Sequence, residues 1–202
     1  GLWNIASSNL INVTLALVAI AFHRRMSDLF DRRFFKELLF ATIGIVAPLV
    51  LMRFGLDKHV AVIPSLLVLF VAYVLLDRGD GEPPEGQEQF EGASFAGGLA
   101  FIVGSLALIA LAGDFLGSAT RDVVHQMQVP AVAVGWILGL VTSLPEAVTF
   151  FLVFSTDRAV GAGDRRSQMQ ELLDNLAASN MSNSGLIYPL GLAVFLLGTG
   201  LL

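Results

Sequence analysis

The sequence predicts an all-α, polytopic membrane protein, and two observations lead to that class. Of its 202 residues, 55% are hydrophobic and only 14% are charged, whereas charged residues make up about a quarter of an ordinary globular chain. The charged side chains also fall in short clusters between long uncharged stretches. These stretches approach the roughly 20 residues that a helix needs to cross about 30 Å of hydrocarbon. A soluble domain is therefore nearly excluded.

Six uncharged stretches are candidate crossings. They span residues 5–22, 34–52, 60–76, 93–112, 129–155 and 171–202. The last two are long for a simple crossing, so we expect them to be tilted or broken. Pro48, Pro64, Pro145 and Pro189 lie inside crossings, where proline removes a backbone donor and kinks a helix.

The remaining composition limits the partners. The net charge of −5 provides no basic surface for nucleic acid, and the absence of cysteine excludes disulfides and thiolate chemistry. We expect the lipid bilayer as partner, no nucleic acid and no bound cofactor. Because the chain starts at Gly1 without a methionine and stops at Leu202 inside an apolar stretch, we expect a fragment that lacks flanking helices.

The connections between crossings predict the orientation. The first, third and fifth connections, with their flanking residues, carry nine Lys and Arg, whereas the second and fourth carry three. Because cytoplasmic loops collect positive charge, we expect loops 23–33, 77–92 and 156–170 to be cytoplasmic. Residues 77–92 are acidic and rich in Gly and Pro, which is typical of a solvated linker. This linker separates a first half, residues 1–76, from a second half, residues 93–202.

A polar motif occurs in both the first and the sixth crossing. Asn, Ser, Asn and Asn recur at identical spacing 171 positions later, as Asn4, Ser8, Asn9 and Asn12 and then Asn175, Ser179, Asn180 and Asn183. Because the first crossing is predicted to run inward and the sixth outward, the copies form an inverted repeat, which in transporters surrounds a midplane substrate site. The alternative is that small polar residues only hold helices together. Asparagine fits that alternative less well, because each amide must satisfy two donors and a carbonyl.

The fifth crossing contains Glu146 within the sequence Thr142-Ser143-Leu144-Pro145-Glu146. A carboxylate at the bilayer centre costs at least about 2.5 kcal/mol on insertion scales, so it normally faces a cavity or a partner. Pro145 frees backbone carbonyls, and we expect the helix to be interrupted near Leu144 and Pro145. Together with Thr142 and Ser143 this is an all-oxygen cluster, which suits hard cations such as Ca²⁺ or Na⁺. The alternative is a protonated acid hydrogen-bonded in the bundle.

At these residues the sequence resembles the sodium/calcium exchanger group of the cation/calcium antiporter superfamily. The alpha repeats of that family pair a Thr-Ser-x-Pro-Glu helix with a helix carrying Gly-Asn-x-x-Gly-Ser-Asn-x-x-Asn. The second repeat is matched by residues 142–146 and 175–183, and the back half of the first repeat by residues 4–12. The resemblance implies an inverted-repeat bundle of about ten helices, of which six are visible here.

The resemblance implies an antiporter, not an enzyme, which exchanges Ca²⁺ for Na⁺ or H⁺ by alternating access. Carried over by position, the ion ligands are Glu146, Thr142, Ser143, Asn4, Asn175, Ser8 and Ser179. We therefore expect Asn4, Asn175 and Glu146 to converge. Four positions depart from the family pattern: Trp3 and Asp174 replace the usual Gly before the first asparagine of each motif, and Ser7 and Ala178 replace the next Gly. The asparagines are neutral, so the visible site charge is −1 and the coupling ion stays open.

Three other functions compete with this one. A cation/proton exchanger of the same fold and a cation channel both remain open on residues alone. An intramembrane hydrolase would need a serine with a general base at membrane depth. The histidines, His23, His59 and His125, map to loops or helix ends, which argues against it.

The orientation can be tested with single cysteines, since the chain contains none. We expect a cysteine at Glu85, in the acidic linker, to react only with reagents that reach the cytoplasmic side, because of the nine-to-three distribution of Lys and Arg. A cysteine at Lys58, in the second loop, is the matched external control. Labelling of the Glu85 position from outside intact cells would reverse the assignment.

Overall fold

The computed structural model describes residues 2–77, 130–155 and 162–200, with the single positions 97, 100, 104 and 126. The chain divides into two compact units, one formed by residues 1–76 and 135–202 and the other by residues 77–134. The acidic linker and the predicted crossing 93–112 lie almost entirely outside the described residues. The candidate site and its supporting helices belong to the first unit.

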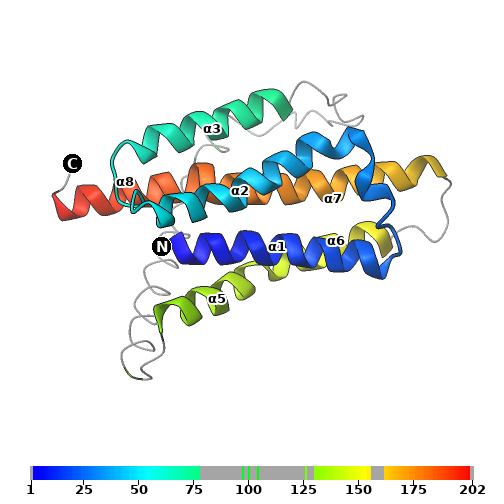
Figure 1. Cartoon of the computed structure of the whole chain (residues 1–202), viewed down its shortest axis with the longest axis horizontal. Coiled ribbons are helices and arrows are strands. Elements are labelled where there is room, and N and C mark those ends of the chain that lie inside the picture. The colour runs from blue at the N-terminus through cyan, green and yellow to red at the C-terminus, as the bar shows by residue number, and fades with distance from the viewer. Residues whose placement is uncertain are drawn as a thin grey trace. The chain divides into compact units, whose positions relative to one another are not determined.

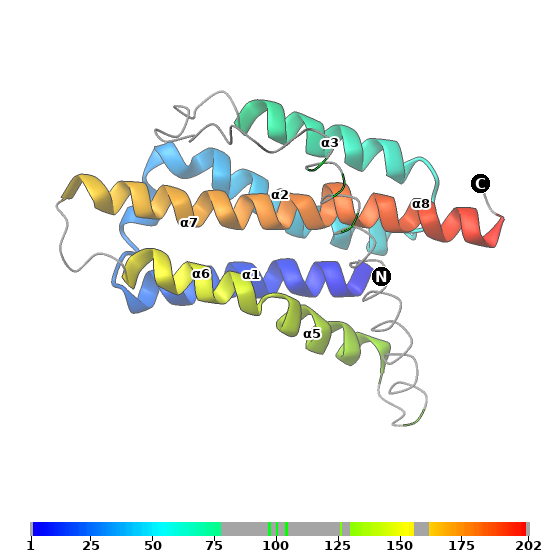
Figure 2. The same ribbon diagram turned by 180° about the vertical axis from the view of Figure 1, so that it is seen from behind.

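The regular elements of the described part are all helical. In chain order they are α1 (Leu2–Phe22), the short 3₁₀ turns η1 (Asp28–Phe30) and η2 (Arg32–Phe34), α2 (Phe35–Arg53), α3 (Val62–Asp77), α5 (Ala131–Thr142), α6 (Leu144–Ser155), α7 (Ala162–Ser182), the π-helical segment η3 (Asn183–Ile187) and α8 (Tyr188–Thr199). Figures 1 and 2 show α1 and α7 side by side and running in opposite directions. This arrangement agrees with the predicted inversion of the two motifs.

Three helices of the described part are long and apolar enough to cross a membrane, namely Leu2–Phe22, Arg32–Arg53 and Arg165–Thr199. The pair α5 and α6, which is bent by 40°, meets the same criteria only when the two helices are taken together. The prediction of an all-α polytopic membrane protein is thereby confirmed. The helix within the predicted crossing 60–76 is α3, which at 16 residues is shorter than the other spans.

The boundary predicted for the last crossing was wrong. The helix begins at Ala162, not at residue 171, so residues 162–170 of the predicted loop 156–170 are helical. The length of an uncharged stretch indicates only which part of a helix lies in hydrocarbon. The added turns hold Arg165, Arg166 and Gln168, which are good helix formers that can extend a helix into water.

Three of the four prolines predicted inside crossings lie at the start of a helix, and the fourth, Pro48, lies inside α2. Pro64, Pro145 and Pro189 occupy the second or third position of α3, α6 and α8, where a backbone N–H has no partner within its helix. At the start of α8, the N–H of Tyr188 bonds to the carbonyl of Asn183, five residues back. This π turn lets the helix continue through Pro189 to Thr199.

On α1, most of the side chains that face the bundle are small or polar, while several large apolar side chains face outward. On α1 the buried side chains include Ala6, Asn9 and Ala16, whereas Leu17, Val18 and Phe22 are at least 40% exposed. Lipid tails are as apolar as leucine, so membrane helices gain stability mainly from close packing and interhelical hydrogen bonds. The distribution of side chains is the one that this requirement predicts.

Gly44 of α2 permits one of the close contacts between helices. A Cβ atom added there would lie 2.8 Å from the Cβ of Asn180 and 3.0 Å from its backbone oxygen. The backbone of α7 cannot yield without disturbing its helix. Gly44 is therefore required for α2 and α7 to pack at their observed separation.

We expect Gly44→Ala to lower the free energy of unfolding by about 1–3 kcal/mol, because the added methyl overpacks the contact between α2 and α7. Gly198→Ala is the matched control, since no atom lies within 4 Å of its added Cβ. Thermal unfolding in detergent micelles measures both variants. Equal stability of Gly44→Ala and Gly198→Ala would contradict this packing.

Candidate functional site

The helix through Glu146 is broken, as the sequence predicted. α5 ends at Thr142 and α6 begins at Leu144, so the break falls at Ser143. Pro145 causes it, because the proline cannot donate to the preceding turn and disfavours helical geometry at Leu144. Glu146 thus lies in the first turn of α6, where the helix dipole stabilises a negative charge.

The two asparagine motifs meet where α1 and α7 contact each other, and their hydrogen bonds are reciprocal. The Asn9 amide donates to the Asn180 carbonyl at 3.2 Å, and the Asn180 amide donates to the Asn9 carbonyl at 3.4 Å. Asn12 donates to the side-chain oxygen of Asn180 at 3.3 Å, and Asn183 donates to that of Asn9 at 2.9 Å. Each bond therefore has a counterpart 171 positions away. The repeat in sequence corresponds to a pseudo-two-fold contact.

Asn9 and Asn180 also bind α2, and both are fully buried. The Asn9 amide donates to the carbonyl of Gly44 at 2.8 Å, and the Asn180 amide donates to that of Ala41 at 3.3 Å. Their donors are therefore used to hold three helices together. The middle asparagine of each motif is a structural cross-link.

Three of the predicted ligands line one cavity. It has a volume of about 380 Å³, and its lining is Pro145, Glu146, Thr149, Phe150, Asn175, Ala178, Ser179 and Ser182. The hydroxyl of Ser179 donates to Oε1 of Glu146 at 3.0 Å. The broken helix and the second motif thus supply Glu146, Asn175 and Ser179 to the same space.

Asn12 approaches this group from the first motif, although it was not among the predicted ligands. Its amide donates to the Ser179 hydroxyl at 3.1 Å. Two fully buried acceptors, Oδ1 of Asn12 and Oε2 of Glu146, have no hydrogen-bond donor. Leaving a buried acceptor unsatisfied costs about 1–3 kcal/mol. A cation held by these oxygens, or a proton on Glu146, would remove that cost.

Ser8 and Ser143 form a second polar contact, one helical turn away. Their hydroxyls are 3.0 Å apart, and Ser143 also reaches the Ser8 carbonyl at 3.4 Å. Ser8 precedes Asn12 by one turn of α1, and Ser143 precedes Glu146 by nearly one turn. These serines hold the break against α1.

Two predicted ligands lie elsewhere. The Thr142 hydroxyl donates to the carbonyls of Leu138 and Gly139 in its own helix, at 2.9 and 3.1 Å, and this exposed residue does not line the cavity of Glu146. Asn4 lines a different cavity, of about 600 Å³, together with Asp57, Lys58 and Tyr188.

The expected convergence of Asn4 with Asn175 was therefore wrong. Asn4 and Asn175 each precede their central asparagine, Asn9 or Asn180, by five residues on antiparallel helices. At about 1.5 Å per residue, they lie on opposite sides of that contact. In an inverted repeat, equivalent residues of the two copies lie on opposite sides of the symmetry axis. They meet only when both are close to that axis.

The structure also buries a carboxylate that the sequence analysis did not single out. Glu37, in the first turn of α2, is 4% exposed. Its Oε1 accepts from Gln170 at 2.9 Å and lies 3.8 Å from the ammonium of Lys36. Glu37 lies at the edge of the predicted crossing 34–52, and nothing in the sequence around it indicated that its side chain is buried. The contact with Gln170 joins α2 to α7 near one end of the bundle.

The described residues contain no group of three or more His, Cys, Asp or Glu side chains that could hold a metal ion. The groups around Ser179 that could bind a cation are instead one carboxylate, neutral amides and hydroxyls. Such oxygen ligands suit hard cations.

An inverted helical repeat with a broken helix and a half-buried carboxylate is the architecture of a secondary transporter for cations. Residues 97–199, just over half of the chain, match the family described as Sodium/calcium exchanger protein. The chain belongs to that family and is an integral membrane protein. No curated protein matches the chain significantly, and no solved structure does so either.

Proposed function

We propose that the protein exchanges Ca²⁺ for Na⁺ or H⁺ across the membrane, with the transported ion held between Glu146 and Asn12. The observation that carries the proposal is the pair of buried, donorless oxygens, Oε2 of Glu146 and Oδ1 of Asn12. Both side chains bond to the Ser179 hydroxyl, so both belong to one polar cluster. Membership of the exchanger family supports the same conclusion.

The ligand chemistry supports a calcium ion as cargo. Ca²⁺ takes 6–8 oxygen ligands at about 2.3–2.6 Å and accepts carboxylates, amide carbonyls and water. Glu146 supplies the charge, and Asn12 and Ser179 supply neutral oxygens. Asn175, which lines the same cavity, is a further proposed ligand, and Ser8 and Ser143 stand one turn away. Water and residues outside the described ranges would complete the shell.

A single carboxylate also accounts for exchange. Glu146 cannot hold a proton and coordinate Ca²⁺ with full charge at the same time, and Na⁺ would compete for the same oxygens. The ions therefore exclude one another from the site, which is what an exchange mechanism requires.

The arrangement of the cavities is compatible with alternating access. The cavity of Glu146 and the cavity of Asn4 are lined from opposite sides of the contact between α1 and α7. That contact is cross-linked by Asn9 and Asn180. We propose that it acts as the fixed part of the transporter, against which the broken helix moves.

We expect Glu146→Gln to abolish Ca²⁺ uptake into proteoliposomes driven by a Na⁺ or pH gradient, because it removes the anionic ligand and keeps the shape of the side chain. Glu171→Gln is the matched control, since Glu171 is exposed on α7. Comparison of the two gradients identifies the coupling ion. Uptake by Glu146→Gln equal to that of the control would exclude the proposed site.

We expect Asn12→Ala to raise the Ca²⁺ concentration for half-maximal uptake by about tenfold, which corresponds to about 1.4 kcal/mol. Asn4→Ala is the control, because Asn4 also has a buried, donorless Oδ1 on α1 but lines the other cavity. We expect a change within about twofold for that variant. If instead Asn4→Ala gave the larger effect, the ligand set carried over from the family motif would be preferred to the geometric one.

A further inference from the structure

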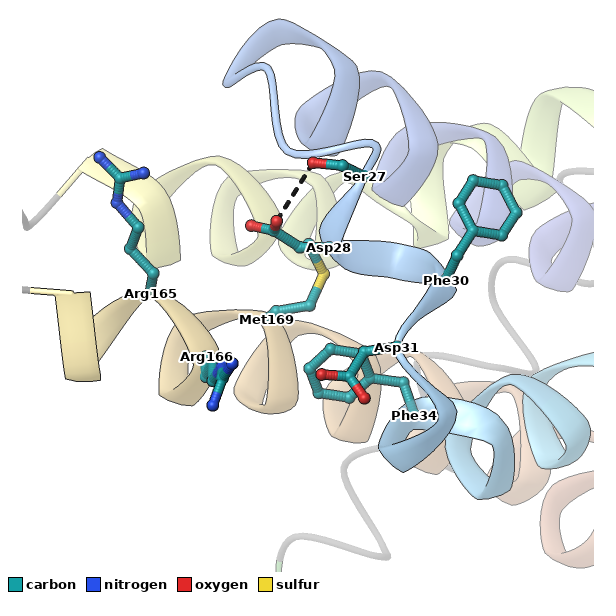
Figure 3. Close-up of a pocket in the computed structure, with 8 residues that line it drawn as sticks. All are labelled: Ser27, Asp28, Phe30, Asp31, Phe34, Arg165, Arg166 and Met169. Atoms are coloured by element: carbon teal, nitrogen blue, oxygen red, sulfur yellow. Dashed lines mark hydrogen bonds between the residues drawn. The ribbon is translucent and has the colours of Figure 1, made fainter.

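A polar cavity of about 410 Å³ lies at the end of the bundle where the η1–η2 connection meets the start of α7 (Figure 3). Its lining is Ser27, Asp28, Phe30, Asp31, Phe34, Arg165, Arg166 and Met169. Two of the candidate membrane spans, Arg32–Arg53 and Arg165–Thr199, begin here. The cavity is therefore at the level where a membrane surface changes from headgroups to hydrocarbon.

The cavity contains charges of both signs that do not neutralise each other. Among the described residues, neither Arg165 nor Arg166 has a carboxylate oxygen within 4.0 Å of its guanidinium. Asp28 accepts a hydrogen bond from the Ser27 hydroxyl, and Asp31 pairs with Arg33 at 3.2 Å. Two cations on α7 thus face the same space as two carboxylates of the connection.

An apolar groove of about 500 Å³ adjoins this cavity. Its lining is Leu29, Phe30, Asp31, Arg32, Phe35 and Leu38. Phe30 and Asp31 line both spaces, so the polar cavity and the apolar groove are adjacent. Phe30 is 80% exposed and Phe35 is 67% exposed, which leaves aromatic surface available to a hydrocarbon chain.

We infer that this surface binds an aminophospholipid, with the headgroup in the polar cavity and an acyl chain in the groove. The phosphate would bind Arg165 and Arg166, since guanidinium groups make strong charge-assisted bonds to phosphate. The primary ammonium would bind Asp28, with Asp31 beside it. The acyl chain would pack on Phe35 and Leu38.

The pattern of charges selects this headgroup over others. A headgroup of phosphate and glycerol has no cation for Asp28 and would place its anion near two carboxylates. A choline headgroup carries a cation, but its quaternary nitrogen has no N–H to donate to a carboxylate. The preference of cytoplasmic loops for Lys and Arg accounts for the arginines alone. It accounts for neither the two aspartates nor the groove.

Native mass spectrometry of the purified, delipidated protein with added lipid tests the proposal. The probes are phosphatidylethanolamine, phosphatidylcholine and phosphatidylglycerol with identical acyl chains. We expect the ethanolamine lipid to be retained about fivefold or more over the other two. We expect Asp28→Asn to abolish its advantage over phosphatidylglycerol, and Arg165→Gln with Arg166→Gln to reduce retention of all three lipids.

Arg53→Gln, at the far end of α2, is the matched control and should leave the preference unchanged. The headgroup comparison on the unaltered protein needs no variant, so a folding defect in one variant does not prevent a decision. Equal retention of the three lipids would mean a nonspecific annular layer and would overturn the proposal. Preferred binding of phosphatidylglycerol, insensitive to Asp28→Asn, would overturn it in favour of a purely anionic site. Neither result depends on transport, so the test is independent of the proposed exchange.

Discussion

The reciprocal amide bonds between Asn9 and Asn180 are the interaction on which the rest of this bundle depends. In hydrocarbon, helices gain little from burying apolar side chains, so packing and hydrogen bonds must hold them together. These two side chains are fully buried and bind each other's backbones as well as the carbonyls of α2. They can do so only because Gly44 lets the backbone of α7 come close to α2.

The candidate ion site follows from this contact. Once Asn9 and Asn180 determine how α1 lies on α7, Asn12 is brought within hydrogen-bond distance of Ser179. Ser179 in turn meets Glu146, which the break at Ser143 places in the first turn of α6. Three separate helices therefore contribute to one oxygen cluster. Its position is controlled by residues that are not proposed as ligands.

The two copies of the motif are equivalent in sequence but not in their partners. Ser179 bonds to the carboxylate of Glu146, whereas Ser8, its counterpart, bonds to the hydroxyl of Ser143. The hydrogen bonds between the asparagines therefore obey the pseudo-two-fold symmetry, whereas those of Ser8 and Ser179 do not. One consequence is that the charge of the described site comes from the second repeat alone.

Much of this protein was determined by its sequence. Composition and uncharged length predicted a polytopic helical membrane protein, because hydrocarbon requires apolar helices of a minimum length. Pro145 predicted the broken helix through local backbone chemistry. The paired motifs predicted the inversion, and the Thr142–Glu146 pentapeptide led to the correct family. Each of these is a local or a repeated property, which a single chain can reveal.

The tertiary structure alone decided which residues of the motifs meet. Spacing within an inverted repeat does not say where the axis lies, so the sequence analysis named Asn4 as a ligand and not Asn12. The contact at Asn9 and Asn180 places Asn12 beside Ser179 and leaves Asn4 in another cavity. Burial of Glu37 and the position of Asp28 and Arg165 around one cavity likewise depend on how segments distant in sequence pack. Such contacts have no signature in either segment alone.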